Sequence, residues 1–290
     1  MIKVQEAHSK FVDHLKSQGR SSATVLAYGK DIEQLAAFLE NLKKHQVHEI
    51  ATADLQAFMA KLVKEGYTPK SISRKTNSTK TFFRFLKINE FITDDPASLL
   101  EHPKFDMKPP RILSKMEYRA LRDAARDDIR ISAIVELLLQ TGIRIGELAK
   151  LKLSDVKFGE NGKSGELHVP AGESYPDRNV PLNKASETAL KRYLEARPSA
   201  KEETLFITKT GRPLLVRNIR TAIDRYFRLA GIKDAKVNDL RHTFVAHHLM
   251  SGTSLVLVSK LAGHKRLATT EKYLNLIQNS LDEPVKLEEL

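Results

Sequence analysis

Three side chains able to act together on a phosphate ester lie near the C-terminal end of the sequence. They are Arg241, His264 and Tyr273, the last of which comes nine residues after the histidine. An arginine can bind an anionic phosphate, an imidazole can transfer a proton, and a phenol can attack as a nucleophile. A second arginine, Arg144, lies about a hundred residues earlier in the chain. This set of residue types predicts attack on a phosphodiester.

Each residue also has a simpler interpretation when it is taken alone. Arg144 could form a structural salt bridge with Glu147, three residues later on a helix. A tyrosine such as Tyr273 is often a core residue, and a lone histidine is often held by a backbone group. In the chemical interpretation, the two arginines bind the non-bridging oxygens of the phosphate. Tyr273 then forms a covalent phosphotyrosyl link that stores the bond energy, so no ATP site is required.

Composition indicates which partners and compartments suit the chain. Its 290 residues are enough for two domains, and its formal charge of +12 favours a polyanion such as DNA or RNA. A basic protein without a nucleic-acid role is the alternative. The sequence has no cysteine, which excludes disulfides and thiol nucleophiles and suits a reducing compartment. No apolar run is long enough to span a bilayer, and the N-terminus does not resemble a signal peptide, so we expect a soluble cytoplasmic protein.

Hydrophobic periodicity predicts a mainly α-helical protein of two domains. Residues 1–102 show repeated helical spacing and form the first expected domain. Residues 103–111 contain three prolines and are the expected linker. Residues 112–290 form the second expected domain, which is helical through Leu148 and again from Ala185 onwards. Between these helices, short alternating segments within 152–182 predict a small antiparallel sheet.

The first domain contains a basic segment that could bind DNA. Between Lys70 and Lys87 the sequence has six cations and no acid. A helix with apolar residues on one face and cations on the other can bind phosphates while it packs on a core. An ordinary solvated face is the alternative. The predicted DNA-binding residues are Lys70, Arg74, Lys75, Lys80 and Arg84.

The combined spacing of these motifs resembles the tyrosine recombinase (phage integrase) family, particularly its Xer-like and mobile-element members. The segment Thr24–Ile32 and the basic segment resemble that family's N-terminal, SAM-like core-binding domain. In the second domain, Arg144 and Arg241 match the two active-site arginines. His264 matches the second active-site histidine, and Tyr273 matches the nucleophile.

The resemblance implies further properties that the residue pattern alone does not give. It implies cleavage and rejoining of DNA through a 3′-phosphotyrosyl intermediate, with no metal and no cofactor. The implied partner is duplex DNA with paired recombination sites, bound by a homo- or heterotetramer that exchanges strands through a Holliday junction. Residues 278–290 would dock on a neighbouring subunit, and no membrane is involved.

Two positions depart from the family pattern. Asn238 stands where a histidine or lysine usually precedes the second arginine; it can form hydrogen bonds but cannot carry a proton at neutral pH. Glu173 occupies the turn position of the lysine that normally protonates the departing 5′ oxygen. Lys163 or Lys209 could replace this lysine, or water or Tyr175 could supply the proton. Alternatively, the protein could bind DNA and cleave it poorly.

Three functions therefore remain open at this point. An active recombinase is the expected function, because the nucleophile and both arginines are present. A catalytically impaired DNA-binding member of the family is the first alternative. DNA relaxation of the type IB topoisomerase kind is the second. The target site, the biological role (dimer resolution, integration or inversion) and any partner recombinase depend on DNA contacts that the sequence does not reveal.

Overall fold

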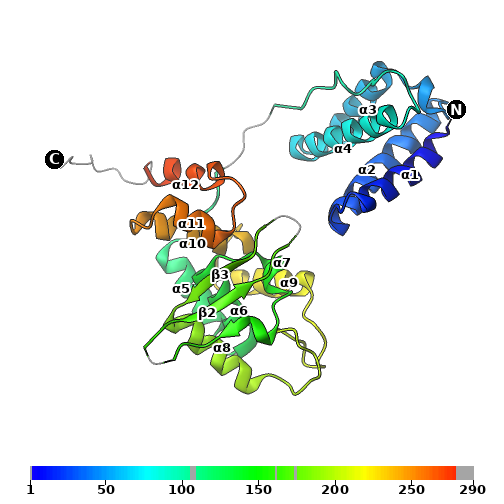
Figure 1. Ribbon diagram of the computed structural model, residues 1–290. Coiled ribbons are helices and arrows are strands. Elements are labelled where there is room, and N and C mark those ends of the chain that lie inside the picture. Colours follow the sequence, from blue (N-terminus) through cyan, green and yellow to red (C-terminus); the bar gives the residue numbers. More distant parts are fainter. Residues whose placement is uncertain (1, 105–108, 161, 173–174, 279–290) are drawn as a thin grey trace. The chain divides into compact units, whose positions relative to one another are not determined.

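The computed structural model describes residues 2–104, 109–160, 162–172 and 175–278 of the chain (Figure 1). The chain divides into two compact units, Met1–Met107 and Lys108–Leu290, and each has its own hydrophobic core. The expected linker, 103–111, includes residues 105–108, which lie outside the described residues. Within the described ranges, no helix is long and apolar enough to cross a membrane.

The first unit is entirely helical. Its elements are α1 (Val4–Ser17), α2 (Ser22–Asn41), the short 3-10 helix η1 (Val47–Glu49), α3 (Thr52–Lys64) and α4 (Pro69–Ile88). Helix α4 begins at Pro69, because the hydroxyl of Thr68 accepts a hydrogen bond from the backbone N–H of Ser71, and Pro69 suits the first turn. The core between the helices contains the buried rings of Phe11 and Phe82, which pack edge to face with their centroids 5.3 Å apart.

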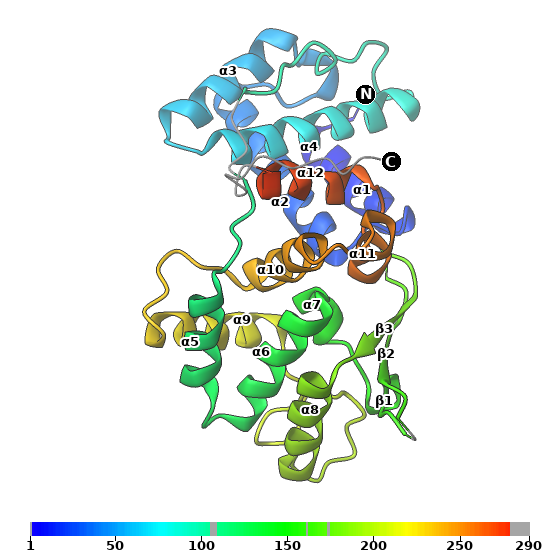
Figure 2. The same ribbon diagram turned by 90° about the vertical axis from the view of Figure 1, so that its left-hand side faces the viewer.

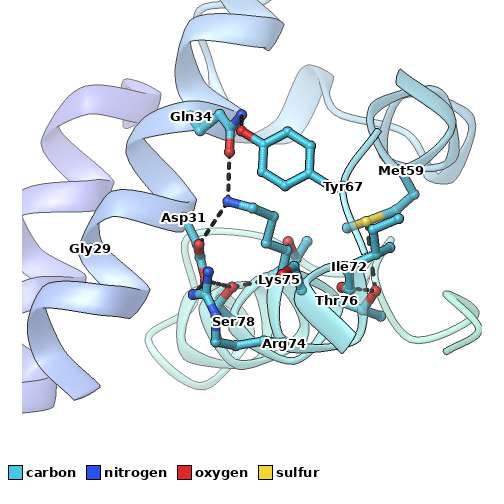
Figure 3. Close-up of polar contacts among 12 residues, drawn as sticks. Gly29, Asp31, Gln34, Met59, Tyr67, Ile72, Arg74, Lys75, Thr76 and Ser78 are labelled. Atoms are coloured by element: carbon cyan, nitrogen blue, oxygen red, sulfur yellow. Dashed lines mark hydrogen bonds and ion pairs between the residues drawn. The ribbon is translucent and has the colours of Figure 1, made fainter. Parts of the chain in front are cut away.

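A buried polar cluster joins α2 to α4 (Figure 3). The Asp31 carboxylate accepts hydrogen bonds from the Lys75 ammonium at 2.9 Å and the Ser78 hydroxyl at 2.9 Å, and it also pairs with Arg74. The Lys75 ammonium donates a second hydrogen bond to Gln34 Oε1 at 2.6 Å. Asp31, Lys75 and Ser78 are all buried. Buried charges of this kind persist only when they are paired, so the cluster fixes how α2 packs on α4.

In the second unit, helices pack on one face of a small sheet, which lies at the edge of the unit (Figure 2). Its helices are α5 (Lys115–Ala125), α6 (Ile129–Thr141), α7 (Ile145–Leu148), η2 (Leu153–Asp155), α8 (Lys184–Ala196), α9 (Val216–Leu229), α10 (Val237–Met250), α11 (Leu255–Ala262) and α12 (Ala268–Gln278). Helices α6 and α8 contact the sheet, while α5 and α9 pack together on α6. Helices α11 and α12 both pack on α10 (Figure 1). The expected mainly α-helical fold with a small antiparallel sheet is confirmed.

The sheet has the order β1 (Val156–Lys157), β2 (Gly165–Val169) and β3 (Arg178–Leu182), and all its pairs are antiparallel. Strands β2 and β3 pair from Gly165 opposite Leu182 to Val169 opposite Arg178. Residues 167, 169, 180 and 182 alternate inward into the core, as the sequence pattern predicts. The register places Arg178 beside the β2–β3 turn.

The buried cluster around Asp31 predicts which cation of α4 stabilises the fold. We expect Lys75→Met to lower the free energy of unfolding of the first unit by about 3 kcal/mol, because it removes one partner of a buried carboxylate. Lys70→Met, on the exposed face of the same helix, should change it by less than about 0.5 kcal/mol. Amide hydrogen exchange of α2 and α4 in the full chain measures both effects. Equal protection in the two variants would contradict the structural role of Lys75.

Candidate active site

The structure brings together the four residues singled out for phosphodiester chemistry. Arg144 lies at the start of α7, and its Nη2 donates to the backbone carbonyl of Gly263, at the end of α11, at 2.9 Å. Arg241 on α10 donates from Nη1 to the backbone carbonyl of Gly142 at 2.6 Å. The rings of His264 and Tyr273 lie nearly parallel, with centroids 6.5 Å apart. One site therefore collects residues from three separate segments of the chain.

A sharp chain reversal positions Arg144. Helix α6 ends at Gly142, whose φ of 61° is in the left-handed region that favours glycine. A Cβ on Gly142 would lie 2.2 Å from the ring of Phe244, so a side chain there would displace α10. Arg144 then caps α7, and its backbone N–H donates to Glu147 Oε2 at 2.8 Å. The segment expected to be helical through Leu148 is therefore interrupted at this point, and the interruption directs Arg144 toward the site.

The buried Glu147 carboxylate holds two arginines. Arg178 on β3 donates to it from Nη1 at 3.2 Å and from Nη2 at 2.7 Å, and Arg144 Nη1 donates at 2.9 Å. Burial alone would raise the pKa of Glu147, but the hydrogen bonds from Arg178 and from the Arg144 backbone, with the charges of both arginines, hold it below its ordinary value. Glu147 is thus ionised and fixes both guanidinium groups. The salt bridge between Arg144 and Glu147 exists, and about a third of the Arg144 side chain remains exposed beside it.

Arg241 is buried and only partly satisfied. Within the part of the chain that the structure describes, its Nη2 is buried and has no hydrogen-bond partner. Burial, followed by the neighbouring charges of Arg144 and Arg178, lowers the pKa of Arg241 to about 10. A buried guanidinium nitrogen without an acceptor is costly unless a ligand supplies one. The geometry therefore suits an anionic oxygen placed against Nη2.

His264 is neutral in this environment. Burial, followed by the positive charges of Arg241, Arg144 and Arg178, lowers the pKa of His264 to about 4. Its Nδ1 lies 2.7 Å from the hydroxyl of Thr270, which is fully buried. If that hydroxyl donates, Nε2 carries the proton and can donate to an anionic oxygen.

Tyr273 is a buried tyrosine on α12, 4% exposed, that packs on α10 and α11 beside Phe244 and Val258. Burial raises the pKa of the Tyr273 phenol, although the charge of Arg241 lowers it. Its hydroxyl lies 2.5 Å from Nδ1 of His242, a residue of α10. On the other side of the same ring, His242 Nε2 lies 2.8 Å from the Asn238 amide nitrogen. Asn238 therefore reaches the tyrosine through His242.

The turn between β2 and β3 bears on the missing lysine. Glu173, the residue at the lysine position, and Ser174 lie outside the described residues. Lys163 lies two residues before Gly165, the first residue of β2, whereas Arg178 pairs with Val169, the last residue of β2. Lys163 is therefore at the end of the strand away from the β2–β3 turn. Lys209 lines a different cavity, with Asp127, Asp128 and Tyr193. Tyr175 is the described candidate beside the site, since the Arg144 guanidinium lies 5.3 Å from its ring centroid.

The predicted DNA-binding residues of α4 occupy different environments. Lys70, Arg74 and Arg84 are exposed, and Lys80 is half-buried with its ammonium 3.3 Å from the Ser98 carbonyl. Lys75 is buried and bonded to Asp31 and Gln34, so it is not on the exposed face where the sequence pattern placed it. The pattern failed there because the buried carboxylate that neutralises Lys75 comes from another helix, α2.

Two residues of the site were missed by sequence reasoning, Arg178 and His242. Arg178 stands at an inward strand position, where an arginine signals a buried carboxylate partner. His242 directly follows Arg241, and it stands four residues after Asn238, which places the two on one helical face. Among the described residues, no group of three or more histidine or acidic side chains could hold a metal ion.

The Glu147 ion pairs predict a pH-dependent stability. The folded pKa of Glu147 is below its ordinary value near 4.5, so its contribution is present above that pH and is lost as pH falls through the folded value. We expect Glu147→Gln to lower the unfolding free energy of the second unit by about 3 kcal/mol at pH 7. The difference should shrink below pH 4.5. Urea unfolding of the full chain at several pH values measures it, with the exposed Glu195→Gln as the control; a difference independent of pH would refute the assignment.

Comparison with known proteins gives one consistent result. The model of the phage integrase family matches residues 111–279, and that of its N-terminal SAM-like domain matches residues 9–90. Tyrosine recombinase XerC of Roseiflexus castenholzii is 30% identical over 97% of this chain and 92% of its own length. A lambda integrase dimer bound to a COC′ core site has the same fold, with a TM-score of 0.78, 19% identity and 99% coverage of both chains. A lambda integrase tetramer bound to a Holliday junction matches with a TM-score of 0.74, 20% identity and coverage of 92% and 78%. The chain belongs to the phage integrase family.

Proposed function

We propose that this chain is a site-specific DNA recombinase that cleaves and rejoins DNA through a covalent 3′-phosphotyrosyl intermediate. The observation that carries the proposal is the buried Tyr273 hydroxyl within a site that holds three arginines and two carboxylates, Glu147 and Asp239. Such a site has an excess of positive charge, and the Arg241 Nη2, which has no hydrogen-bond partner among the described residues, is available to an acceptor. The relationship to tyrosine recombinase XerC supports the same activity.

The proposed reaction assigns a role to each predicted residue. Arg144 and Arg241 bind the non-bridging oxygens of the scissile phosphate and stabilise the charge of the transition state. His264 donates a hydrogen bond from Nε2 to the same phosphate. The Tyr273 oxygen attacks phosphorus, the bond to the 5′ oxygen breaks, and the chain becomes joined to the 3′ phosphate. Attack by a 5′ hydroxyl of another strand reverses these steps and exchanges the strands.

The source of the proton for the departing 5′ oxygen is the least constrained part of the proposal. The position of Lys163 at the far end of β2 and of Lys209 in another cavity disfavours both lysines. The ring of Tyr175 lies beside Arg144 and within 5.9 Å of the Arg178 guanidinium. Tyr175, or a water molecule held near it, is therefore the donor we favour.

The proposal also covers the role of each domain and the partners of the chain. We propose that residues 1–102 grip duplex DNA through α4, that 103–111 form a linker, and that 112–290 carry the reaction. A homo- or heterotetramer on paired recombination sites is proposed, as in the lambda integrase tetramer that shares this fold. The C-terminal segment after α12 is proposed to dock on a neighbour; residues 279–290 lie outside the described structure. We propose a cytoplasmic location, where the DNA substrate is found.

A catalytically impaired DNA-binding protein is the second candidate function, and one observation favours it. Neither Lys163 nor Lys209 lies at the β2–β3 turn, where the family's lysine is missing, while Asn238 replaces a protonatable residue. Such a protein would bind its site and form little covalent adduct. Relaxation of supercoiled DNA without exchange between two sites would instead indicate a topoisomerase.

Trapping of the covalent intermediate tests the proposed reaction. In a cognate duplex nicked beside the cleavage position, cleavage releases a short fragment that carries the 5′ hydroxyl. This fragment diffuses away and cannot reverse the reaction, so the native chain should accumulate a protein–DNA adduct. Tyr273→Phe should form none, whereas Tyr226→Phe, a partly buried tyrosine on α9, should form it normally. Denaturing electrophoresis measures the adduct. A native chain that binds this DNA without adduct would support the impaired protein, and exchange between two labelled sites separates a recombinase from a topoisomerase.

Binding of the first unit to DNA can be tested with α4. We expect Arg84→Ala to weaken binding and to reduce the slope of log affinity against log salt by about 0.9, the value for one lost phosphate contact. Lys64→Ala, an exposed residue of α3, should leave the slope unchanged. Electrophoretic mobility shifts at several salt concentrations measure both. Equal slopes in the two variants would argue against a grip through α4.

A further inference from the structure

His242 is the side chain that the structure places against the proposed nucleophile. Its Nδ1 lies 2.5 Å from the Tyr273 hydroxyl, and the two ring centroids are 5.7 Å apart. Helix α10 supplies the histidine and α12 the tyrosine, and the two helices pack on each other. The imidazole nitrogen and the hydroxyl are within hydrogen-bonding distance of each other. His242 is therefore in position to exchange a proton directly with the Tyr273 oxygen.

We propose that His242 is the general base that removes the proton from Tyr273, and that Asn238 positions its ring. The proposal rests on the proposed function and adds a residue to that reaction. In the attacking step, the Tyr273 oxygen forms its bond to phosphorus while its proton moves to His242 Nδ1. The bond to the 5′ oxygen breaks, that oxygen leaves with the electron pair, and it takes a proton that reaches it from water or Tyr175. In rejoining, His242 returns its proton to the tyrosine oxygen.

Asn238 suits this task because its amide has two different ends of similar shape. With Nδ2 toward His242 Nε2, as placed at 2.8 Å, the amide donates, and the imidazole proton must lie on Nδ1. With Oδ1 turned to the same position, the amide accepts from Nε2–H and leaves Nδ1 free to accept the proton of Tyr273. The second orientation is competent for attack. An asparagine can support both tautomers, whereas a lysine could only donate.

The other histidine of the site is less suited to be the base. His264 Nδ1 is occupied by Thr270, and its ring lies nearly parallel to that of Tyr273, an arrangement that does not aim its nitrogens at the hydroxyl. The charges of three arginines further favour its neutral form. Burial lowers the pKa of His242 as well, but the Asp239 carboxylate opposes this effect, and Arg241 is the one arginine charge that adds to it. His242 is therefore the imidazole better placed to carry a proton.

The test uses the full chain and the nicked duplex, and its main variant is His242→Asn. The amide nitrogen of asparagine takes the position of Nδ1, so a hydrogen bond to Tyr273 is kept while the base is lost. We expect adduct formation to slow by about 100-fold or more, within the range for general bases, with DNA affinity unchanged. His247→Gln, an exposed histidine of the same helix, is the matched control. A His242→Asn rate equal to that of the native chain would overturn the proposal.

A sulfur substrate distinguishes a base from an acid. A bridging sulfur in place of the scissile 5′ oxygen leaves as a thiolate without protonation. If His242 acts on the nucleophile, His242→Asn should be slow on the oxygen and the sulfur substrates alike. If His242→Asn cleaved the sulfur substrate at the native rate and stayed slow only on the oxygen substrate, His242 would act on the leaving group. That result would overturn the proposal.

A pH profile tests the role of Asn238. The groups around His242 are Tyr273 on α12, Asp239, Arg241 and Asn238 on α10, and His264 before α12. Asn238→Asp adds a carboxylate to this set and should move the acidic limb of the cleavage rate to higher pH. A merely structural asparagine would leave the limb unmoved, which would overturn this part of the proposal.

Failure of the further inference can be told from failure of the proposed function. A native chain that forms an adduct dependent on Tyr273, together with an unimpaired His242→Asn, refutes the base alone. A native chain that forms no adduct refutes the proposed function, and the base with it. Circular dichroism and DNA binding of His242→Asn show whether the variant is folded, so loss of activity cannot be mistaken for loss of structure.

Discussion

The contact on which the rest of the active site depends is the buried ion pair between Glu147 and Arg178. It ties α7 to β3, and the same carboxylate holds Arg144. The Arg178 Nε also donates to the carbonyl of Leu261 at 2.8 Å, so the network continues into α11. The same arginine restricts the residue type after α11, because a Cβ on Gly263 would lie 2.7 Å from the Arg178 guanidinium. The Glu147–Arg178 pair thus joins three segments, α7, β3 and α11, that meet at the proposed phosphate site.

This arrangement leaves the site short of negative charge. Glu147 pairs with the guanidinium groups of Arg144 and Arg178. Burial first, and the neighbouring arginine charges second, lower the pKa values of Arg241 and His264. A phosphate in this position would supply the missing charge and an acceptor for Arg241. The strained electrostatics of the free site are therefore a form of preorganisation, because the donors are already placed and need little rearrangement when the anion arrives.

Sequence reasoning recovered what depends on local pattern and failed where a distant partner decides. The helices, the small sheet and the start of α4 follow from periodicity and capping. The burial of Lys75 does not, because Asp31 comes from another helix and its carboxylate cannot be seen within the basic segment. The break at Gly142 lies within a segment whose pattern is helical through Leu148. Both the left-handed backbone of Gly142 and the approach of Phe244, about a hundred residues later, call for a glycine there. Arg178 was missed for the same reason.

The departure at Asn238 has a physical consequence that a comparison of residue types alone would not show. Losing a protonatable side chain at this position looks like a loss of catalytic function. In the structure, however, Asn238 and His242 stand one helical turn apart, and the hydrogen bonds run from the amide through the imidazole to the Tyr273 hydroxyl. In our proposal the proton-accepting group lies one turn further along α10 than Asn238, and the asparagine supports it. What must be preserved is an acceptor at the phenol oxygen, and helix geometry allows more than one residue position to supply it.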